Sequence, residues 1–232
     1  MAQTFVVDNK LRAALRLDSI TTLVDARHVL QQLADSREAA EQIAFADQLV
    51  LNKIDLVTAV ELGEVERSLR RLNPLAPVHR ALRGQLPLAQ VLGRGGFDLD
   101  RITTLEADFL APPHEHDEHC DHDHDHDHQH DSGITSVSLR SALPMDAAKV
   151  QAWLAQLVAT QGAHILRAKG IFDIAGEARR MVFQSVHMVL EGDWQRSWRE
   201  GEYRHSRLVF IGRQLDGAAL QAGLDRCAAG EG

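Results

Sequence analysis

Over residues 1–105, short apolar runs alternate with longer stretches in which hydrophobic and polar positions have an amphipathic pattern. The run at residues 48–51, Gln-Leu-Val-Leu, is typical of a buried parallel strand, and residues 57–73 carry apolar side chains at helical spacing. The same reading predicts strands at residues 20–26, 48–52 and 77–82, and helices at residues 8–17, 28–46 and 57–73. Strands that alternate with helices in this way predict a parallel α/β sheet.

The pattern is different from residue 133 onward. Residues 134–141 alternate as a strand does, and residues 146–161 place Val150, Leu154 and Leu157 on one side of a helix. We expect strands at residues 134–141, 164–174, 179–191 and 206–215, and helices at residues 146–161 and 217–227. Strands grouped between two helices predict a small α+β domain over residues 134–227.

Residues 106–133 separate these regions and have a composition that cannot bury a core. Residues 114–131 read HEHDEHCDHDHDHDHQHD, which holds eight acidic residues and no Lys or Arg. Of the 33 Asp and Glu residues in the chain, the other 25 balance its 25 Lys and Arg residues. Without a net basic surface to neutralise phosphates, we expect no nucleic acid partner.

Other features of the composition indicate the compartment. No apolar run approaches the roughly 20 residues that a membrane span requires, and the first residues lack the pattern of a signal peptide. The two cysteines, Cys120 and Cys227, make no disulfide framework. The sequence therefore predicts a cytoplasmic protein with no membrane partner.

A motif that carries chemistry follows the strand at residues 48–52. Asn52-Lys53-Ile54-Asp55 matches the N-K-x-D sequence with which many GTP-binding proteins read guanine. It lies at the carboxyl end of a predicted parallel strand, where open α/β sheets bind their ligands. The phosphate-binding pattern GxxxxGK[ST] does not occur in the 232 residues. The sequence thus holds half of a nucleotide site.

The histidine-rich stretch is a candidate metal site. In an extended chain, histidines at every second residue lie on one face, about 6.6 Å apart, and neutral imidazoles suit Zn²⁺, Co²⁺, Ni²⁺ and Cu²⁺. We predict several exchangeable sites of modest affinity, and the alternative is a solvated linker that binds metal incidentally. The candidate ligands are His114, His116, His119, Cys120, His122, His124, His126, His128 and His130.

Together these features resemble the CobW-type metallochaperone GTPases. The resemblance covers nearly the whole chain, in the segments TFVVD, LRLDSITTLVDARH, QIAFADQLVLNKIDL and LNPLAPV and, after the histidines, ILRAKGIF, VFQSVHM and RLVFIGRQLD. It implies a partial P-loop NTPase-like parallel sheet at residues 1–105, which corresponds to the carboxyl-terminal half of the GTPase domain. It also implies a metal-binding linker at residues 106–133 and a CobW carboxyl-terminal α+β domain at residues 134–227.

The resemblance also implies roles for the motif residues. Asp55 accepts two hydrogen bonds from the N1–H and the exocyclic amine of guanine, Lys53 packs along the base, and Asn52 braces the loop. The P-loop, the CxCC motif and the Walker-B region of the family are missing, so no catalytic residue is assigned and Mg²⁺ belongs with the missing half. We expect a fragment that is inactive alone, from a truncated gene, a misplaced start codon or a split protein.

The implied function is GTP-dependent supply of zinc, cobalt or nickel to a client metalloprotein. The alternative is a non-enzymatic metal-buffering or client-docking protein built on a decayed GTPase half-domain. A shortened parallel sheet exposes the edge of an inner strand, and such edges pair with other chains. We therefore expect self-association or a complementary amino-terminal partner. Arg167, Lys169 and Arg207 lie in strands that match the family, and the sequence gives them no mechanism.

Overall fold

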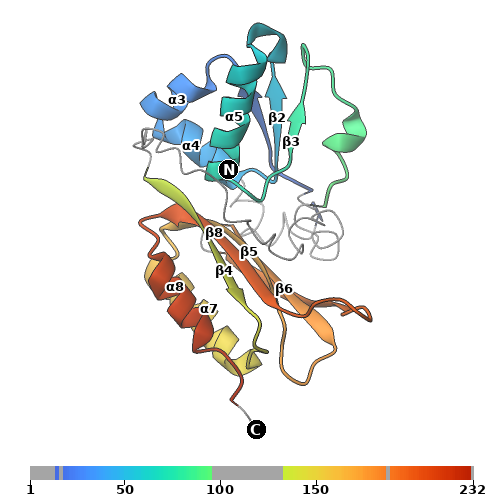
Figure 1. The fold of residues 1–232 in the computed structure, drawn as a ribbon, viewed down its shortest axis with the longest axis vertical. Coiled ribbons are helices and arrows are strands. Elements are labelled where there is room, and N and C mark those ends of the chain that lie inside the picture. The colour runs from blue at the N-terminus through green and yellow to red at the C-terminus, as the bar shows by residue number, and fades with distance from the viewer. Residues whose placement is uncertain (1–13, 16–17, 96–132, 187–188, 231–232) are drawn as a thin grey trace, which may run out of the picture.

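The computed structural model describes residues 14–15, 18–95, 133–186 and 189–230, which form one unit on each of two β-sheets (Figure 1). The first sheet is parallel, with strand order β1-β2-β3. The second is antiparallel, with order β4-β8-β5-β6-β7. A parallel α/β sheet followed by an α+β unit is the fold class that the sequence predicted.

In the first unit, helices pack on the sheet through the apolar residues of the buried strands. Leu49 and Leu51 of β2 share a hydrophobic cluster with Val65 and Leu69 of α5. Thr58 begins α5 with a capping box, in which its hydroxyl and the Glu61 carboxylate each accept a backbone N–H. The elements are β1 Thr21–Asp25, α3 Val29–Asp35, α4 Arg37–Phe45, β2 Gln48–Asn52, η1 Ile54–Leu56, α5 Ala59–Leu72, β3 Val78–Arg80 and η2 Leu88–Gln90.

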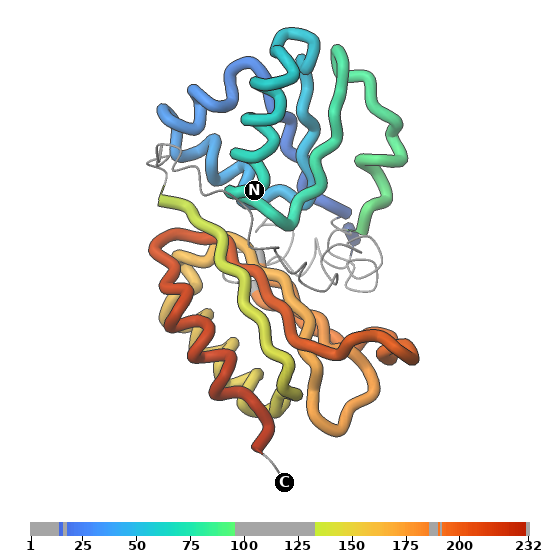
Figure 2. Tube along the Cα trace, in the orientation of Figure 1, coloured from blue at the N-terminus to red at the C-terminus, as the bar shows by residue number. Residues whose placement is uncertain are grey.

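The second unit covers one face of its sheet with α7 and α8 (Figure 2). Phe172, Phe183 and Phe210 form the centre of this layer, with neighbouring ring centroids 5.3 Å and 6.3 Å apart. Gly223 of α8 allows the close approach of Trp153, because an added Cβ would lie 2.3 Å from the indole Nε1. The elements are β4 Ile134–Ser141, α7 Ala147–Gln161, β5 Ile165–Phe172, β6 Arg179–Val186, β7 Val189–Ser197, β8 Ser206–Arg213 and α8 Gly217–Asp225.

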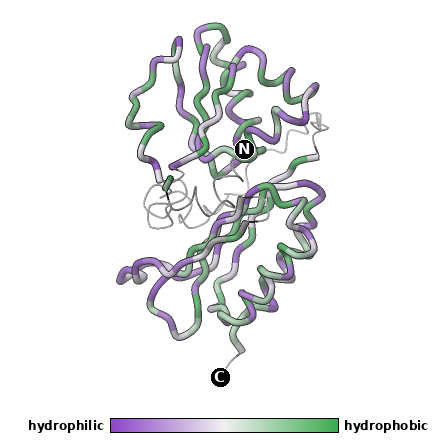
Figure 3. The backbone as a smooth tube through the Cα atoms, turned by 180° about the vertical axis from the view of Figure 1, so that it is seen from behind, coloured by the Kyte–Doolittle hydropathy of each residue, from purple (hydrophilic) through white to green (hydrophobic). Residues whose placement is uncertain are grey.

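The other face of the second sheet packs against the first unit. A single hydrophobic cluster contains Ile43 and Leu49 from the first unit and Leu166, Val209 and Ile211 from the second. Figure 3 shows that the central strands of the second sheet are largely hydrophobic, whereas the segment that projects between β7 and β8 is hydrophilic. The central strands β5 and β8 are therefore buried on both faces.

Two predicted elements are wrong because each contains a break. The helix expected at residues 28–46 is divided into α3 and α4 at Ser36, whose extended backbone (φ −133°, ψ 117°) lets its hydroxyl cap α4 by accepting the Ala39 amide. The strand expected at residues 179–191 is divided between the antiparallel strands β6 and β7. The helix expected at residues 8–17 lies largely outside the described residues.

Among the described residues, no helix has both the length and the apolar character that crossing a membrane requires.

Asn73, directly after α5, connects α4 to the turn that leads into β3. Its side chain is fully buried, and its amide nitrogen donates to three carbonyl groups of residues 43–46 at 2.7 to 3.3 Å. Its oxygen accepts the amides of Leu75 and Ala76, both at 3.1 Å. One side chain thereby satisfies backbone groups that a helix end and a turn leave unpaired.

We expect Asn73→Ala to lower the free energy of unfolding by about 2–4 kcal/mol, because several buried backbone groups lose their partners. Chemical denaturation of the full chain measures this change. The control is Gln31→Ala, which truncates an exposed side chain of α3. A midpoint that moves as little for Asn73→Ala as for the control would contradict the role given to Asn73.

Candidate functional site

The candidate site lies at the carboxyl edge of the parallel sheet, in the loops after β1, β2 and β3. Asn52 ends β2, and Lys53 follows in the left-handed backbone region (φ 60°, ψ 32°). This turn leads into η1, which contains Asp55. A left-handed non-glycine residue is uncommon and is typical of functional loops. The tetrapeptide is therefore held in a tight turn rather than in an extended loop.

Asn52 joins the three loops. Its side-chain oxygen accepts the Gly84 amide at 2.9 Å, which ties the loop after β3 to the end of β2. Its carbonyl oxygen accepts the Ala26 amide at 3.0 Å, which does the same for the loop after β1. Gly84 has a φ of 75°, a value that suits glycine and turns its N–H toward Asn52.

Lys53 makes an ion pair that the sequence did not reveal. Its ammonium lies 2.7 Å from Asp25 Oδ2 at the end of β1, and the imidazole Nδ1 of His28 lies 3.0 Å from the same oxygen. Burial raises the pKa of the Asp25 carboxyl, but the hydrogen bonds from Lys53 and His28 outweigh it and lower that pKa to about 2. Asp25 therefore stays ionised and positions the lysine.

Asp55 is the residue of the motif whose side chain is available to a ligand. Its side chain is exposed, and within the described part of the chain its carboxylate has no hydrogen bond or ion pair. An ionised carboxylate presents acceptor oxygens only. Asp55 can therefore bind a ligand that offers a pair of N–H donors, without first giving up an internal contact.

Residues 79–81, His-Arg-Ala, lie at the carboxyl end of β3. Arg80 makes a bidentate pair with Glu66 of α5, at 2.6 Å and 3.0 Å. The Ala81 amide donates to the carbonyl of Leu51 in β2. These residues hold the sheet together, and the loop after β3 reaches the site through Gly84.

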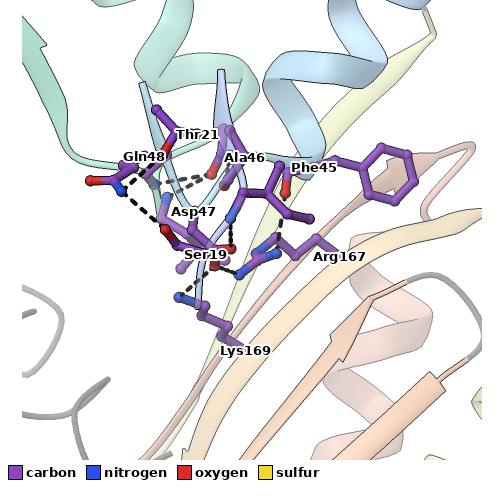
Figure 4. A network of polar contacts seen from close by, with 12 residues as sticks. Ser19, Thr21, Phe45, Ala46, Asp47, Gln48, Arg167 and Lys169 are labelled. Atoms are coloured by element: carbon purple, nitrogen blue, oxygen red, sulfur yellow. Dashed lines mark hydrogen bonds and ion pairs between the residues drawn. The ribbon is translucent and has the colours of Figure 1, made fainter. Parts of the chain in front are cut away.

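The opposite edge of the same sheet contacts the second unit (Figure 4). Asp47, directly before β2, makes a buried ion pair with Arg167 of β5, and Lys169 of β5 lies 3.8 Å from the same oxygen. Asp47 Oδ2 accepts the Ile20 amide at 2.8 Å, and Arg167 also donates to the carbonyl of Phe45 at 3.2 Å. β2 thus extends from this contact to the Asn52 loop.

The predicted metal ligands of residues 114–131 lie outside the described residues, so the metal site stays a prediction. Among the described residues, no group of three or more His, Cys, Asp or Glu side chains could hold a metal ion. Cys227 is buried against α8, and burial raises the pKa of its thiol, which disfavours the thiolate that binds metals.

Two family models match the sequence. The model of the CobW/HypB/UreG nucleotide-binding domain matches residues 1–80, and that of the cobalamin synthesis protein cobW C-terminal domain matches residues 134–228. The matches fall on the two units of the fold.

Curated proteins and a solved structure are similar to the chain. The zinc chaperone YjiA of Escherichia coli is 31% identical over 222 residues, which are 95% of this chain and 64% of YjiA. The zinc chaperone CobW of Pseudomonas aeruginosa is 34% identical over 181 residues, 78% of this chain and 44% of that protein. The crystal structure of Zn(II)-bound YjiA GTPase superimposes with a TM-score of 0.79 at 28% identity, covering 98% of this chain and 66% of that one. The chain thus spans less than two thirds of these relatives' lengths.

We expect Asp25→Asn to lower the free energy of unfolding at pH 7 by about 1 kcal/mol, a value reduced for solvent screening of a partly exposed pair. The folded pKa lies below the unfolded value, so the contribution is present above about pH 4 and is lost as the pH falls toward 2. The denaturation midpoints of Asp25→Asn and wild type should therefore differ more at pH 7 than at pH 2.5. The control is Asp35→Asn on exposed α3. A difference as large at pH 2.5 as at pH 7 would contradict this pKa.

Proposed function

The chain belongs to the CobW family, and from that premise we propose that it takes part in GTP-linked delivery of zinc to a client metalloprotein. The observation that carries the proposal is the uncommitted Asp55 carboxylate in an N-K-x-D turn at the carboxyl edge of a parallel sheet. The names of the matched relatives favour zinc over cobalt and nickel as the cargo.

Guanine recognition would use the loops that Asn52 joins. Asp55 would accept the N1–H and the exocyclic amine of the base, a donor pair that adenine does not offer. The stem of Lys53 would lie along the base, with its ammonium held by Asp25. Asn52 would keep the turn and the loop after β3 in place through Gly84.

Phosphoryl transfer requires more than base recognition. Backbone amides of a phosphate-binding loop, its lysine and a bound Mg²⁺ supply most of the stabilisation of the transition state. The 232 residues contain no GxxxxGK[ST] pattern, and the described residues suggest no replacement for these groups. We therefore assign this chain a role in recognising the base and derive no hydrolysis step for it.

Metal binding would use the histidine-rich residues 114–131. Zn²⁺ binds neutral imidazole and thiolate, so affinity falls when histidines become protonated. The eight acidic residues among them would raise the local concentration of cations. The tract would hold zinc in exchangeable sites, from which a client with a stronger site can take it.

We expect the chain to bind GDP weakly and to show no GTP hydrolysis above background. Asp55→Asn should weaken GDP binding about tenfold or more, because the side-chain amide cannot accept both N–H donors of the base. Titration followed by the backbone NMR signal of Gly84 reports binding at this edge. The control is Glu64→Gln, on the exposed side of α5.

Equal GDP affinity for wild type and Asp55→Asn would contradict the assignment to the base edge. Zinc binding without any preference for guanine over adenine nucleotides would instead favour the metal-buffering alternative.

We expect the chain to bind more than one Zn²⁺ at pH 7.5 and to release it as the pH falls through about 6.5, where histidine protonates. Replacing His122, His124, His126, His128 and His130 with Gln should lower the stoichiometry measured by titration calorimetry. The control is His164→Gln, an exposed histidine outside the tract. Undiminished stoichiometry in the five-fold variant would contradict the assignment.

A further inference from the structure

Arg180, on β6 of the second unit, is a buried cation with an unused hydrogen-bonding edge. Its side chain is fully buried, and its Nη1 lies 3.3 Å from the Glu202 carboxylate. Its Nε and Nη2 are also buried, and neither has an acceptor among the described residues. Buried charged donors without acceptors are costly, so their persistence in a fold calls for a reason.

The two unused atoms lie on one edge of the guanidinium group. Nε–H and the adjacent Nη2–H point the same way and fit the two oxygens of a carboxylate. In three other arginines of the described residues, a carboxylate of the same chain occupies this edge. The pairs are Arg80 with Glu66, Arg179 with Glu177 and Arg204 with Asp173. Among the described residues, the same edge of Arg180 has no acceptor.

Trp198, whose ring lies against the Arg180 guanidinium group, has a third unused donor. Its ring centroid is 5.7 Å from the Arg180 guanidinium carbon and 5.8 Å from that of Arg204. Its Nε1 is buried and has no acceptor within the described part of the chain. The Trp198 amide donates to the Ala178 carbonyl at 3.0 Å, which fixes the residue next to β6. Three buried N–H donors, two on Arg180 and one on Trp198, therefore belong to neighbouring side chains and have no acceptor among the described residues.

The charge at this place is also unbalanced. Both terminal nitrogens of Arg196 lie 2.9 Å from the Glu202 carboxylate, so one carboxylate serves Arg180 and Arg196 together. The Arg199 amide donates to it as well, at 2.7 Å. The hydrogen bond from Arg196 lowers the pKa of Glu202 to about 2, so it is already fully ionised. A further anion would meet excess positive charge.

The segment between β7 and β8 contacts Arg180. It projects from the sheet (Figure 1), and its Arg199, Glu200 and Tyr203 are exposed. Glu202 belongs to this segment, so a displacement of the segment would withdraw the carboxylate from Arg180. β7 itself pairs with β6 on one side and is the outer strand of the sheet. An extended peptide could pair with its free edge and reach Trp198 at its end.

We propose that Arg180 and Trp198 bind a carboxylate side chain from an extended acidic segment of a partner protein. The Nε/Nη2 edge of Arg180 takes both carboxylate oxygens, and Trp198 Nε1 donates to one of them. The planar edge fits the two oxygens of a carboxylate, and the outer strand β7 favours a peptide over a free anion. This site requires neither nucleotide nor metal, so it stands apart from the proposed function.

The test uses the full chain and a capped peptide of alternating Thr and Glu, with a matched Thr and Gln peptide. Calorimetry and indole fluorescence should show binding of the Glu peptide and at least about tenfold weaker binding of the Gln peptide. Arg180→Lys keeps a positive charge but loses the two-pronged edge, so we expect about tenfold weaker binding. The control is Arg179→Lys on the neighbouring residue, whose edge is filled by Glu177, and its affinity should equal that of wild type.

Further variants separate binding from folding. Arg180→Met should raise the melting temperature, because it removes buried donors without acceptors, while it abolishes binding. Trp198→Phe keeps the ring and removes the N–H, so binding should weaken several-fold in a folded chain. Equal affinity of wild type and Arg180→Lys, or of wild type and Trp198→Phe, would overturn the proposal. Displacement of the peptide by inorganic phosphate at concentrations where acetate has no effect would also overturn it.

Discussion

The buried ion pair between Asp47 and Arg167 sets how the two units of the fold meet. Charges removed from water need a partner of opposite sign and further hydrogen bonds. Here the Ile20 amide and the Phe45 carbonyl provide those hydrogen bonds. Because each contact has a defined direction, the pair fixes the position of β5 against the start of β2 more narrowly than apolar packing could.

Apolar burial between the units supplies the energy that this ion pair cannot supply alone. Every residue of β5 is buried, since one face packs on α7 and α8 and the other on the first unit. A cluster that includes Leu49 and Ile211 spans both units. Removing the first unit would expose apolar side chains together with Arg167 and Lys169.

Local patterns predicted the parts of the fold that local physics decides. The apolar run of β2 and the amphipathic residues 57–73 gave the parallel sheet and placed the N-K-x-D turn at its carboxyl edge. The break at Ser36 was missed because the apolar spacing continues across it and only the hydroxyl's capping role reveals it. The division into β6 and β7 was missed because the apolar run has no Gly or Pro to mark it.

Contacts between residues that are far apart in the sequence could not be predicted, for a different reason. Asp25 and Lys53 are 28 residues apart, and their pairing depends on the order of strands in the sheet. A carboxylate at the end of one strand and a lysine after the next were a usable signal, since parallel neighbours end at the same edge. Arg167 lay in a matched strand without a role until the packing of the units supplied Asp47.

Both proposed binding sites rest on the contrast between polar groups that have partners within the fold and polar groups that have none among the described residues. Asn73 and Asp47 show that the fold pairs its buried polar atoms where it can, with several partners each. Two of the groups that lack a partner among the described residues are opposite in kind. On the first unit the exposed Asp55 carboxylate offers acceptors, and on the second the buried Nε and Nη2 of Arg180 offer donors. A base with paired N–H groups would suit the first and a carboxylate would suit the second, so the two proposed sites call for ligands of complementary chemistry.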